Sequence, residues 1–175
     1  SNGIKEWDKR FGGTGDEYVF AMQQTNDNGY IIGGYSSSDS SGDKTQPNRG
    51  GTFTLDYWIV KIDSMGNKQW DKRFGGTKDD LLRSLQQTND GGFILGGYSN
   101  SGISGDKTQP NWDMLFGTSY DYWIVKIDSI GNKEWDKRFG GTYNDELFYV
   151  QQTTDMGFIL GGWSNSGMNG DKSQP

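Results

Sequence analysis

The chain has 175 residues, a formal net charge of −6 at pH 7 and a sequence pI of about 4.6. It contains no cysteine and no histidine, which excludes disulfide bonds, Cys/His zinc sites and catalysis by Ser-His-Asp or Cys-His groups. An acidic chain repels nucleic acid and anionic membranes, and no apolar run is long enough to span a bilayer. We therefore expect neither a nucleic-acid partner nor membrane insertion.

Short segments of alternating side chains, bounded by Gly, Asn or Asp, predict strands along the whole chain. In chain order the expected strands are Lys5–Phe11, Tyr18–Thr25, Gly29–Ser36, Asp56–Asp63, Lys68–Phe74, Leu81–Thr88, Gly92–Ser99, Asp121–Asp128, Lys133–Phe139, Glu146–Thr153 and Gly157–Ser164. The 28 glycines and the 14% of aromatic residues are typical of a turn-rich β protein and not of a helical bundle.

These strands belong to a repeated unit. The sequence W-D-K-R-F-G-G begins at Trp7, Trp70 and Trp135, inside a unit of about 64 residues. A repeat of this length indicates a supersecondary unit in which each copy is too small to bury a core alone. The expected repeats are residues 1–55, which lack the first strand, 56–120, and 121–175, which end before the next first strand.

The chain begins and ends within this unit, because Ser1–Trp7 aligns with Ser64–Trp70 and Pro175 precedes the place of a further D-Y-W-I-V-K-I-D. We interpret the sequence as a fragment of a longer array. The alternative is that the missing strand comes from another chain. Either way, unpaired repeat ends predict self-association or closure by oligomerisation.

The strand Asp56–Asp63 has apolar groups on both faces, with Tyr57 and Ile59 on one and Trp58 and Val60 on the other. Consecutive antiparallel strands of this kind, joined by tight turns, predict a four-stranded sheet stacked between two like sheets. The expected class is therefore all-β, with tandem four-stranded antiparallel repeats that resemble β-propeller blades. A β-solenoid would have shorter coils and parallel strands, and a β-sandwich would leave one face polar.

The longest connections are Ser37–Leu55 and Asn100–Tyr120, and only here does the repeat vary in length. In a four-stranded meander these loops share one face with the F-G-G-T turns, so we expect any binding site on that face. Its candidate ligand-binding residues are the aromatic residues that do not repeat, Phe53, Trp112, Phe116 and Tyr120. Trp and Tyr suit sugar rings, although these loops could instead fold over their own apolar side chains.

The unit D-Y-W-I-V-K-I-D-S-x-G-N-K-x-W-D-K-R-F-G-G-T, with D-G-G-F-I-L-G-G-Y-S-N-S, resembles the tandem propeller-type repeats of secreted and surface proteins of Bacteroidetes-type bacteria. The resemblance covers essentially the whole chain. Such chains often end in a type IX secretion sorting domain, which this sequence does not contain. The resemblance implies a secreted or cell-surface array and implies no enzymatic activity.

Other repeated polar residues have structural explanations beside functional ones. Calcium is a possible cofactor because Asp-Gly pairs recur, although D-x-D-x-D-G is not present and Asp also caps turns. The candidate aspartates are Asp27, Asp43, Asp90, Asp106, Asp155 and Asp171, and we assign none of them as a metal ligand. The pairs Gln23-Gln24, Gln86-Gln87 and Gln151-Gln152 are expected to bond backbone between sheets.

No catalytic residue is expected. Asp79 and Asp80 could in principle form a glycosidase pair, but adjacent strand residues face opposite ways. The function that we expect is a non-catalytic extracellular scaffold for binding or adhesion. One alternative is a lectin-like module that binds an extracellular polysaccharide or glycoprotein through its long-loop face. The other alternative is a structural spacer or assembly module.

Overall fold

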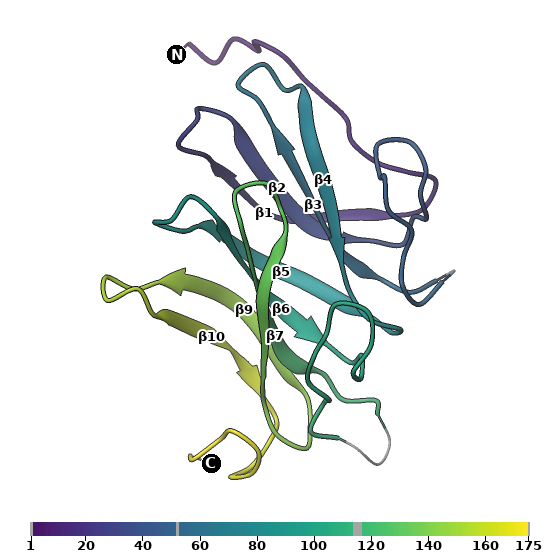
Figure 1. The fold of residues 1–175 in the computed structure, drawn as a ribbon, viewed down its shortest axis with the longest axis vertical. Helices are drawn as coiled ribbons and strands as arrows, with labels where there is room; N and C mark the ends of the chain where they lie inside the picture. The colour runs from purple at the N-terminus through teal and green to yellow at the C-terminus, as the bar shows by residue number, and fades with distance from the viewer. Residues whose placement is uncertain (1, 52, 114–116, 175) are drawn as a thin grey trace.

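The computed structural model describes residues 2–51, 53–113 and 117–174, which form strands and loops only (Figure 1). The strands are β1 (Glu17–Gln24), β2 (Tyr30–Ser36), β3 (Asp56–Ile62), β4 (Lys68–Phe74), β5 (Asp80–Gln87), β6 (Phe93–Ser99), β7 (Asp121–Ile127), β8 (Lys133–Phe139), β9 (Asp145–Gln152) and β10 (Phe158–Ser164). In this part of the chain, no helix could cross a membrane.

The strands form three antiparallel sheets with the orders β1-β2-β3-β4, β5-β6-β7-β8 and β10-β9. This arrangement confirms the expected all-β class and the antiparallel four-stranded sheets, although each sheet is offset by two strands from the expected sequence repeat. The strands in the described ranges close neither a barrel nor a propeller ring. Each four-stranded sheet joins the last two strands of one sequence repeat to the first two of the next. The long loop therefore connects two neighbouring strands of the same sheet, and the F-G-G-T turn connects one sheet to the next.

One expected strand does not form. The sequence predicts a strand over Lys5–Phe11, because this segment repeats the sequence of β4, and this prediction is wrong. A strand needs a neighbour that accepts its hydrogen bonds, and no strand in the described chain pairs with this segment. Its apolar residues still contact the first sheet, because Trp7 meets Tyr30 edge-on at 6.2 Å and Phe11 packs beside Trp58.

The three sheets stack face to face, and Figure 1 shows them in order from the N-terminal to the C-terminal end of the molecule. Between the first two sheets, Ile31 and Ile59 pack with Leu82, Leu95 and other residues of β5 to β7 in the largest apolar cluster. A second cluster joins the middle sheet to β9 and β10. All residues of β3 and β6 are buried, which confirms for β3 the expectation from its two apolar faces.

The glutamine pairs connect the edge strands β1, β5 and β9, which lie next to one another from sheet to sheet. Gln23 Oε1 accepts the backbone N–H of Gln87, and Gln86 Oε1 accepts the N–H of Gln152, both at 2.7 Å. These bonds satisfy edge N–H groups that have no partner in their own sheet. The prediction that these glutamines bond backbone between sheets is confirmed for Gln23 and Gln86.

The long loops and the F-G-G-T turns lie at the same end of the sheets, as expected. Gly75 O accepts the backbone N–H of Asp106 at 2.9 Å, and a carboxylate oxygen of Asp106 accepts the N–H of Gly75 at 3.2 Å. Ser104 Oγ accepts the N–H of Thr77 at 3.0 Å. The buried Lys107 ammonium donates to Ser101 O at 2.7 Å inside the loop. The loop is therefore fastened to the turn that precedes its own sheet.

Candidate functional site

The strongest candidate site is built on β-bulges that recur in the three edge strands. The register shifts between Val19 and Ala21 in β1 and between Leu82 and Ser84 in β5. In β9 a shift occurs at the same place in the repeat. A bulge places an extra residue outside the regular alternation and redirects its side chain. The bulge residues are Phe20, Arg83 and Phe148.

Arg83 is the centre of this group. Its guanidinium carbon lies 4.1 Å from the ring centroid of Phe20, 5.5 Å from that of Tyr35 and 5.1 Å from that of Tyr98. These distances are typical of cation–π contacts. Its Nη2 donates a hydrogen bond to the Tyr98 hydroxyl, but its buried Nε has no hydrogen-bond partner among the described residues.

Further aromatic rings extend the group in both directions. Tyr18 lies 5.0 Å from Tyr35, and Tyr98 meets Tyr120 at 5.2 Å and Phe148 at 6.4 Å, both edge-on. The rings form two groups, one on the first sheet and one on the second and third sheets, and the Arg83 guanidinium lies between them. We call this arrangement the Arg83 strip, and its members are Tyr18, Phe20, Tyr35, Arg83, Tyr98, Tyr120, Phe148 and Tyr149.

The strip is open to solvent at its centre. A shallow hollow of about 340 Å³ is lined by Phe20, Arg83, Phe148 and Tyr149. The Tyr149 side chain is 75% exposed. Burial raises the pKa of Tyr35, and it raises the pKa of Tyr120 to about 12. Both hydroxyls are therefore neutral at physiological pH and can donate as well as accept hydrogen bonds.

The loop aromatics predicted from the sequence are not gathered into one site. Tyr120 belongs to the Arg83 strip, whereas Phe53 is 90% exposed in the β2–β3 loop. Trp112 lies under the guanidinium of Arg138, 4.6 Å from its centre, and donates from Nε1 to Asp171 at 3.0 Å. Phe116 lies outside the described residues.

The sequence pattern alone does not reveal the bulge residues. The three edge strands differ from one another where the rest of the unit is nearly identical, and the Phe, Arg and Phe of the bulges fall within this difference. That variation is the one signal in the sequence that points to them. Their common orientation depends on the bulges, which an alternating pattern does not predict.

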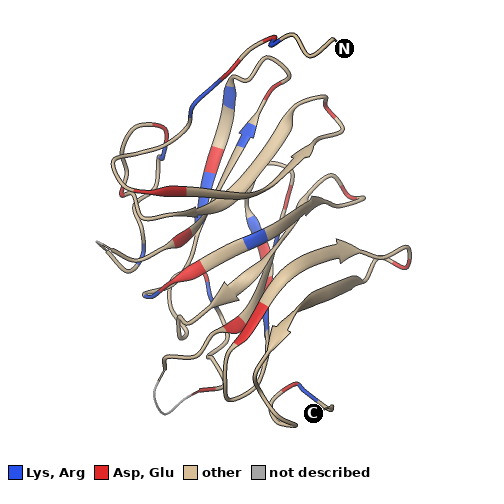
Figure 2. Cartoon of the chain, turned by 180° about the vertical axis from the view of Figure 1, so that it is seen from behind, with Lys and Arg blue, Asp and Glu red and all other residues tan. Residues whose placement is uncertain are grey.

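The aspartates considered for calcium have protein partners. Asp27 forms an ion pair with Lys61 at 2.8 Å, Asp90 forms one with Lys126 at 2.9 Å, and Asp106 forms one with Arg73 at 2.9 Å. In the described parts of the chain, no three acidic side chains are grouped so that they could hold a metal ion. Figure 2 shows that charges of both signs lie on the strands as well as in the loops.

Asp79 and Asp80, the two carboxylates considered as an acid pair, accept hydrogen bonds from backbone N–H groups. Asp79 Oδ1 accepts the N–H of Leu55 at 3.1 Å. Asp80 is fully buried, and its Oδ2 accepts the N–H of Gly76 at 2.7 Å and the hydroxyl of Ser101 at 3.0 Å. Both side chains thus connect a turn to a neighbouring loop or strand.

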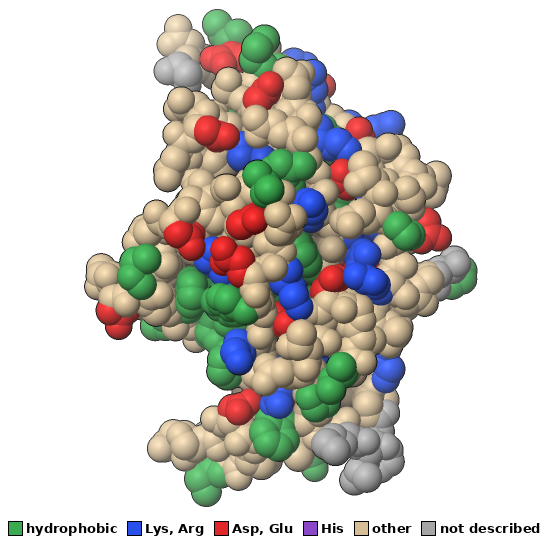
Figure 3. All heavy atoms as spheres, viewed as in Figure 1, with side chains coloured by type: hydrophobic (Ala, Val, Ile, Leu, Met, Phe, Trp, Pro, Cys, Tyr) green, Lys and Arg blue, Asp and Glu red, His purple; other side chains and the backbone are tan. Residues whose placement is uncertain are grey.

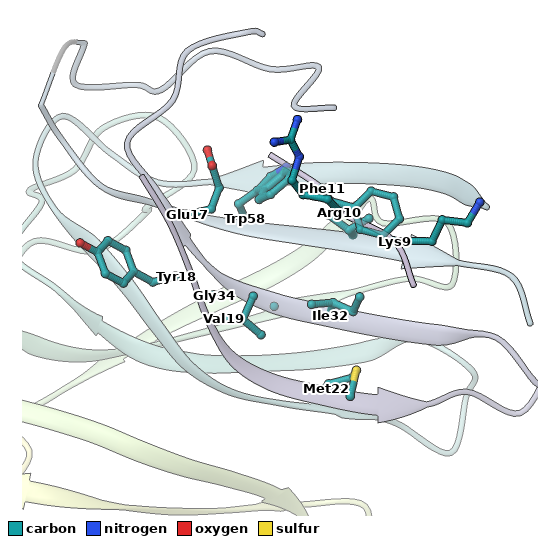
Figure 4. Close-up of a pocket in the computed structure, with 12 residues that line it drawn as sticks. Lys9, Arg10, Phe11, Glu17, Tyr18, Val19, Met22, Ile32, Gly34 and Trp58 are labelled. Atoms are coloured by element: carbon teal, nitrogen blue, oxygen red, sulfur yellow. The ribbon is translucent and has the colours of Figure 1, made fainter. Parts of the chain in front are cut away.

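A second hollow, of about 360 Å³, lies on the outer face of the first sheet (Figure 4). Val19, Met22 and Ile32 form its floor along β1 and β2, and Phe11 and Trp58 lie on its other side (Figure 4). Its lining is mainly apolar. This end of the stack therefore exposes surface that resembles a core.

A comparison of the sequence with protein-family models finds no match, and neither does a search of curated proteins. On the face shown in Figure 3, acidic, basic and hydrophobic side chains are interspersed, and no large area of one charge sign is visible.

Proposed function

We propose that the protein is a non-catalytic extracellular scaffold of propeller-like blades that binds glycans through the Arg83 strip. The stacked four-stranded sheets and the sequence resemblance support the blade architecture. The resemblance also supports a location outside the cell or on its surface. The partner that we propose is an extracellular polysaccharide or a glycoprotein glycan.

The Arg83 strip is the observation that carries this proposal. Exposed aromatic rings offer flat apolar faces on which sugar rings stack, and tyrosine hydroxyls add hydrogen bonds at the edges. Arg83 adds a fixed cation, and its Nε has no partner among the described residues. A guanidinium held among rings can donate to sugar hydroxyls, and it binds carboxylates of acidic sugars with two hydrogen bonds.

The proposal is tested by a glycan array, followed by calorimetric titration of the best ligand. Tyr149→Ala is expected to weaken binding at least about tenfold, because it removes the most exposed ring beside Arg83. Arg83→Met keeps an unbranched side chain and removes the charge, so it is expected to weaken acidic glycans most. Phe53→Ala is the control, since it removes an exposed ring of the β2–β3 loop that lies outside the Arg83 strip. Equal effects of Tyr149→Ala and Phe53→Ala, or an array without ligands, would contradict the proposal.

A second candidate function is an assembly module, and the outer face of the first sheet favours it. Val19 and Met22 are 65% and 67% exposed there. Leu82 and Leu85 occupy the same repeat positions in the middle sheet and are buried against the first sheet. The exposed residues thus belong to a surface whose repeat equivalent is an internal sheet–sheet contact, which fits a further sheet of the same kind.

A further inference from the structure

We infer that the free edge of β10 is an acceptor site for a β-hairpin with the sequence of β7 and β8, supplied by a further repeat unit. The incoming D-Y-W-I-V-K-I strand would pair with β10, and its W-D-K-R-F strand would lie outside it. This inference deepens the assembly role and rests on it. It is independent of glycan binding.

The register of such pairing is set by the two equivalent edges in the molecule. β2 pairs with β3 so that Ser36 lies opposite Asp56, and β6 pairs with β7 so that Ser99 lies opposite Asp121. β10 has the same F-I-L-G-G-x-S sequence as β6, and among the described strands it pairs only with β9. The incoming aspartate therefore lies opposite Ser164. Addition of a strand to a sheet edge is a common mode of peptide recognition.

A cavity marks the place of the incoming tryptophan. In the middle sheet, Trp123 is fully buried, its ring lies 4.9 Å from that of Tyr57, and it belongs to the same apolar cluster as Phe74. The repeat equivalents of Tyr57 and Phe74 are Tyr122 and Phe139. These two residues line a cavity of about 290 Å³ with other residues that include Leu160 and Ser164 of β10. Phe139 is 37% exposed where Phe74 is buried, because nothing in the described chain fills this space.

Charge complementarity places the incoming lysine. Lys61 of β3 pairs with Asp27, and Lys126 of β7 pairs with Asp90, in the turn before the adjacent strand. The third turn has Asp155 at this position. In the described chain its carboxylate bonds only to Thr153 Oγ1 and to the N–H of Gly157. Asp155 is thus the repeat equivalent of Asp27 and Asp90, but the described chain has no lysine at the place where Lys61 and Lys126 pair with them.

The loop after β10 carries the glutamine that holds the outer strand of each hairpin. Gln46 Oε1 accepts the N–H of Arg73 at 2.9 Å, and Gln109 Oε1 accepts the N–H of Arg138 at 2.8 Å. Gln174 occupies the same repeat position and is exposed. A whole hairpin is therefore a better ligand than its inner strand alone. The hairpin also carries an internal bond, since Trp123 Nε1 donates to Asp136 at 3.0 Å.

The test uses the intact 175-residue chain and a fluorescent synthetic peptide of residues 121–139, with binding measured by anisotropy. Saturable binding is expected, with slower hydrogen exchange of the backbone in residues 158–164. Trp123→Ala in the peptide is expected to weaken binding at least about tenfold, because the indole no longer fills the cavity. Lys126→Asp in the peptide is expected to weaken it as well. Asp155→Lys in the protein is expected to restore binding of that Lys126→Asp peptide.

Gly161→Val provides the matched control on β10. A Cβ at Gly161 would meet only the Tyr149 Cβ, at 4.0 Å, so the substitution changes the open face of the sheet and not the pairing edge. Hairpin binding is expected to be unchanged. The inference is overturned by absence of binding at about 1 mM peptide, by failure of the charge exchange to restore binding, or by protection outside β10. Concentration-dependent oligomers without hairpin binding would overturn the acceptor site and leave the assembly role standing.

Discussion

At the scale of single residues, buried carboxyls control how stability depends on pH. Desolvation by burial raises the pKa of Asp80 to about 7, that of Asp121 to about 7 and that of Asp56 to about 6, from a usual value of 3.8. The folded state therefore binds these protons more tightly than the unfolded state does. Their stabilising contribution is complete below about pH 4 and is lost as the pH rises through about 6 to 7.

Other titratable groups change the stability at pH values outside the range in which these carboxyls titrate. Hydrogen bonds from Lys61 and then Thr25 lower the pKa of Asp27 to about 2, and hydrogen bonds from Thr88 and then Lys126 lower that of Asp90 to about 2. Their contribution is present above about pH 4 and is lost as the pH falls toward 2. Burial lowers the pKa of Lys107 to about 8, so its contribution changes chiefly at higher pH. Between about pH 5 and 7.5 the buried carboxyls dominate.

We therefore expect the free energy of unfolding to be higher at about pH 5 than at about pH 7.5, by about 1 kcal/mol or more. Urea unfolding followed by tryptophan fluorescence at the two pH values measures this difference. Asp80→Asn is expected to reduce it, because the amide does not titrate. Asp79→Asn is the matched control at the neighbouring position. A chain that is more stable at about pH 7.5 would contradict the assignment.

At the scale of elements, a pair of equivalent glycines reports on the stacking of the sheets. A Cβ at Gly96 would lie 2.7 Å from Leu147 Cδ2 and 2.9 Å from Val150 Cγ1, both on the next sheet. Gly96→Val is therefore expected to destabilise the fold by about 1–3 kcal/mol, measured by urea unfolding. Gly161→Val, at the same repeat position on the open face, is expected to cost less than about 0.5 kcal/mol. Similar costs at both positions would show that strand conformation and not stacking is responsible.

The glutamine connections between edge strands give a second prediction at this scale. Gln86→Ala removes the acceptor for the N–H of Gln152 and is expected to cost about 1 kcal/mol. Hydrogen exchange at the Gln152 amide is expected to accelerate, which mass spectrometry or NMR can follow. Gln24→Ala is the control, because that exposed side chain makes no hydrogen bond within the described chain. If exchange at Gln152 does not change, the bond does not protect it.

The strands themselves are predictable from the sequence, and some of their surroundings are not. Alternation of apolar residues correctly predicts that β3 is buried on both faces, because it depends only on local spacing. Alternation does not predict that one sheet ends at β4 and the next begins at β5, because this depends on which strands exchange hydrogen bonds. Lys5–Phe11 shows the same limit, because its sequence suits a strand that has no partner here. In the candidate site, the sequence predicts Tyr120. It does not predict Arg83, because the side chain of Arg83 is directed into the site by a β-bulge.

At the scale of the whole molecule, the two ends of the stack are different surfaces, and the termini lie at opposite ends (Figure 1). The first sheet exposes Val19 and Met22, and the last sheet exposes Ile159 beside Gly161. We expect the chain to associate head to tail, so that its mass measured by light scattering rises with concentration. Met22→Glu is expected to lower that mass, and Met65→Glu, at an exposed turn, is the control. A monomer at every concentration would contradict the assembly role.

The sequence identity of β3 and β7 also has a consequence for folding fidelity. Both strands read D-Y-W-I-V-K-I, and both lie between strands of nearly the same sequence. Either one can therefore pair with β2 or β6 in the same register during folding, at the cost of looping out or exchanging a whole hairpin. The native order then depends on chain connectivity more than on side-chain complementarity. Because the repeats are nearly identical, forms in which β3 and β7 have exchanged places compete with the native fold during folding.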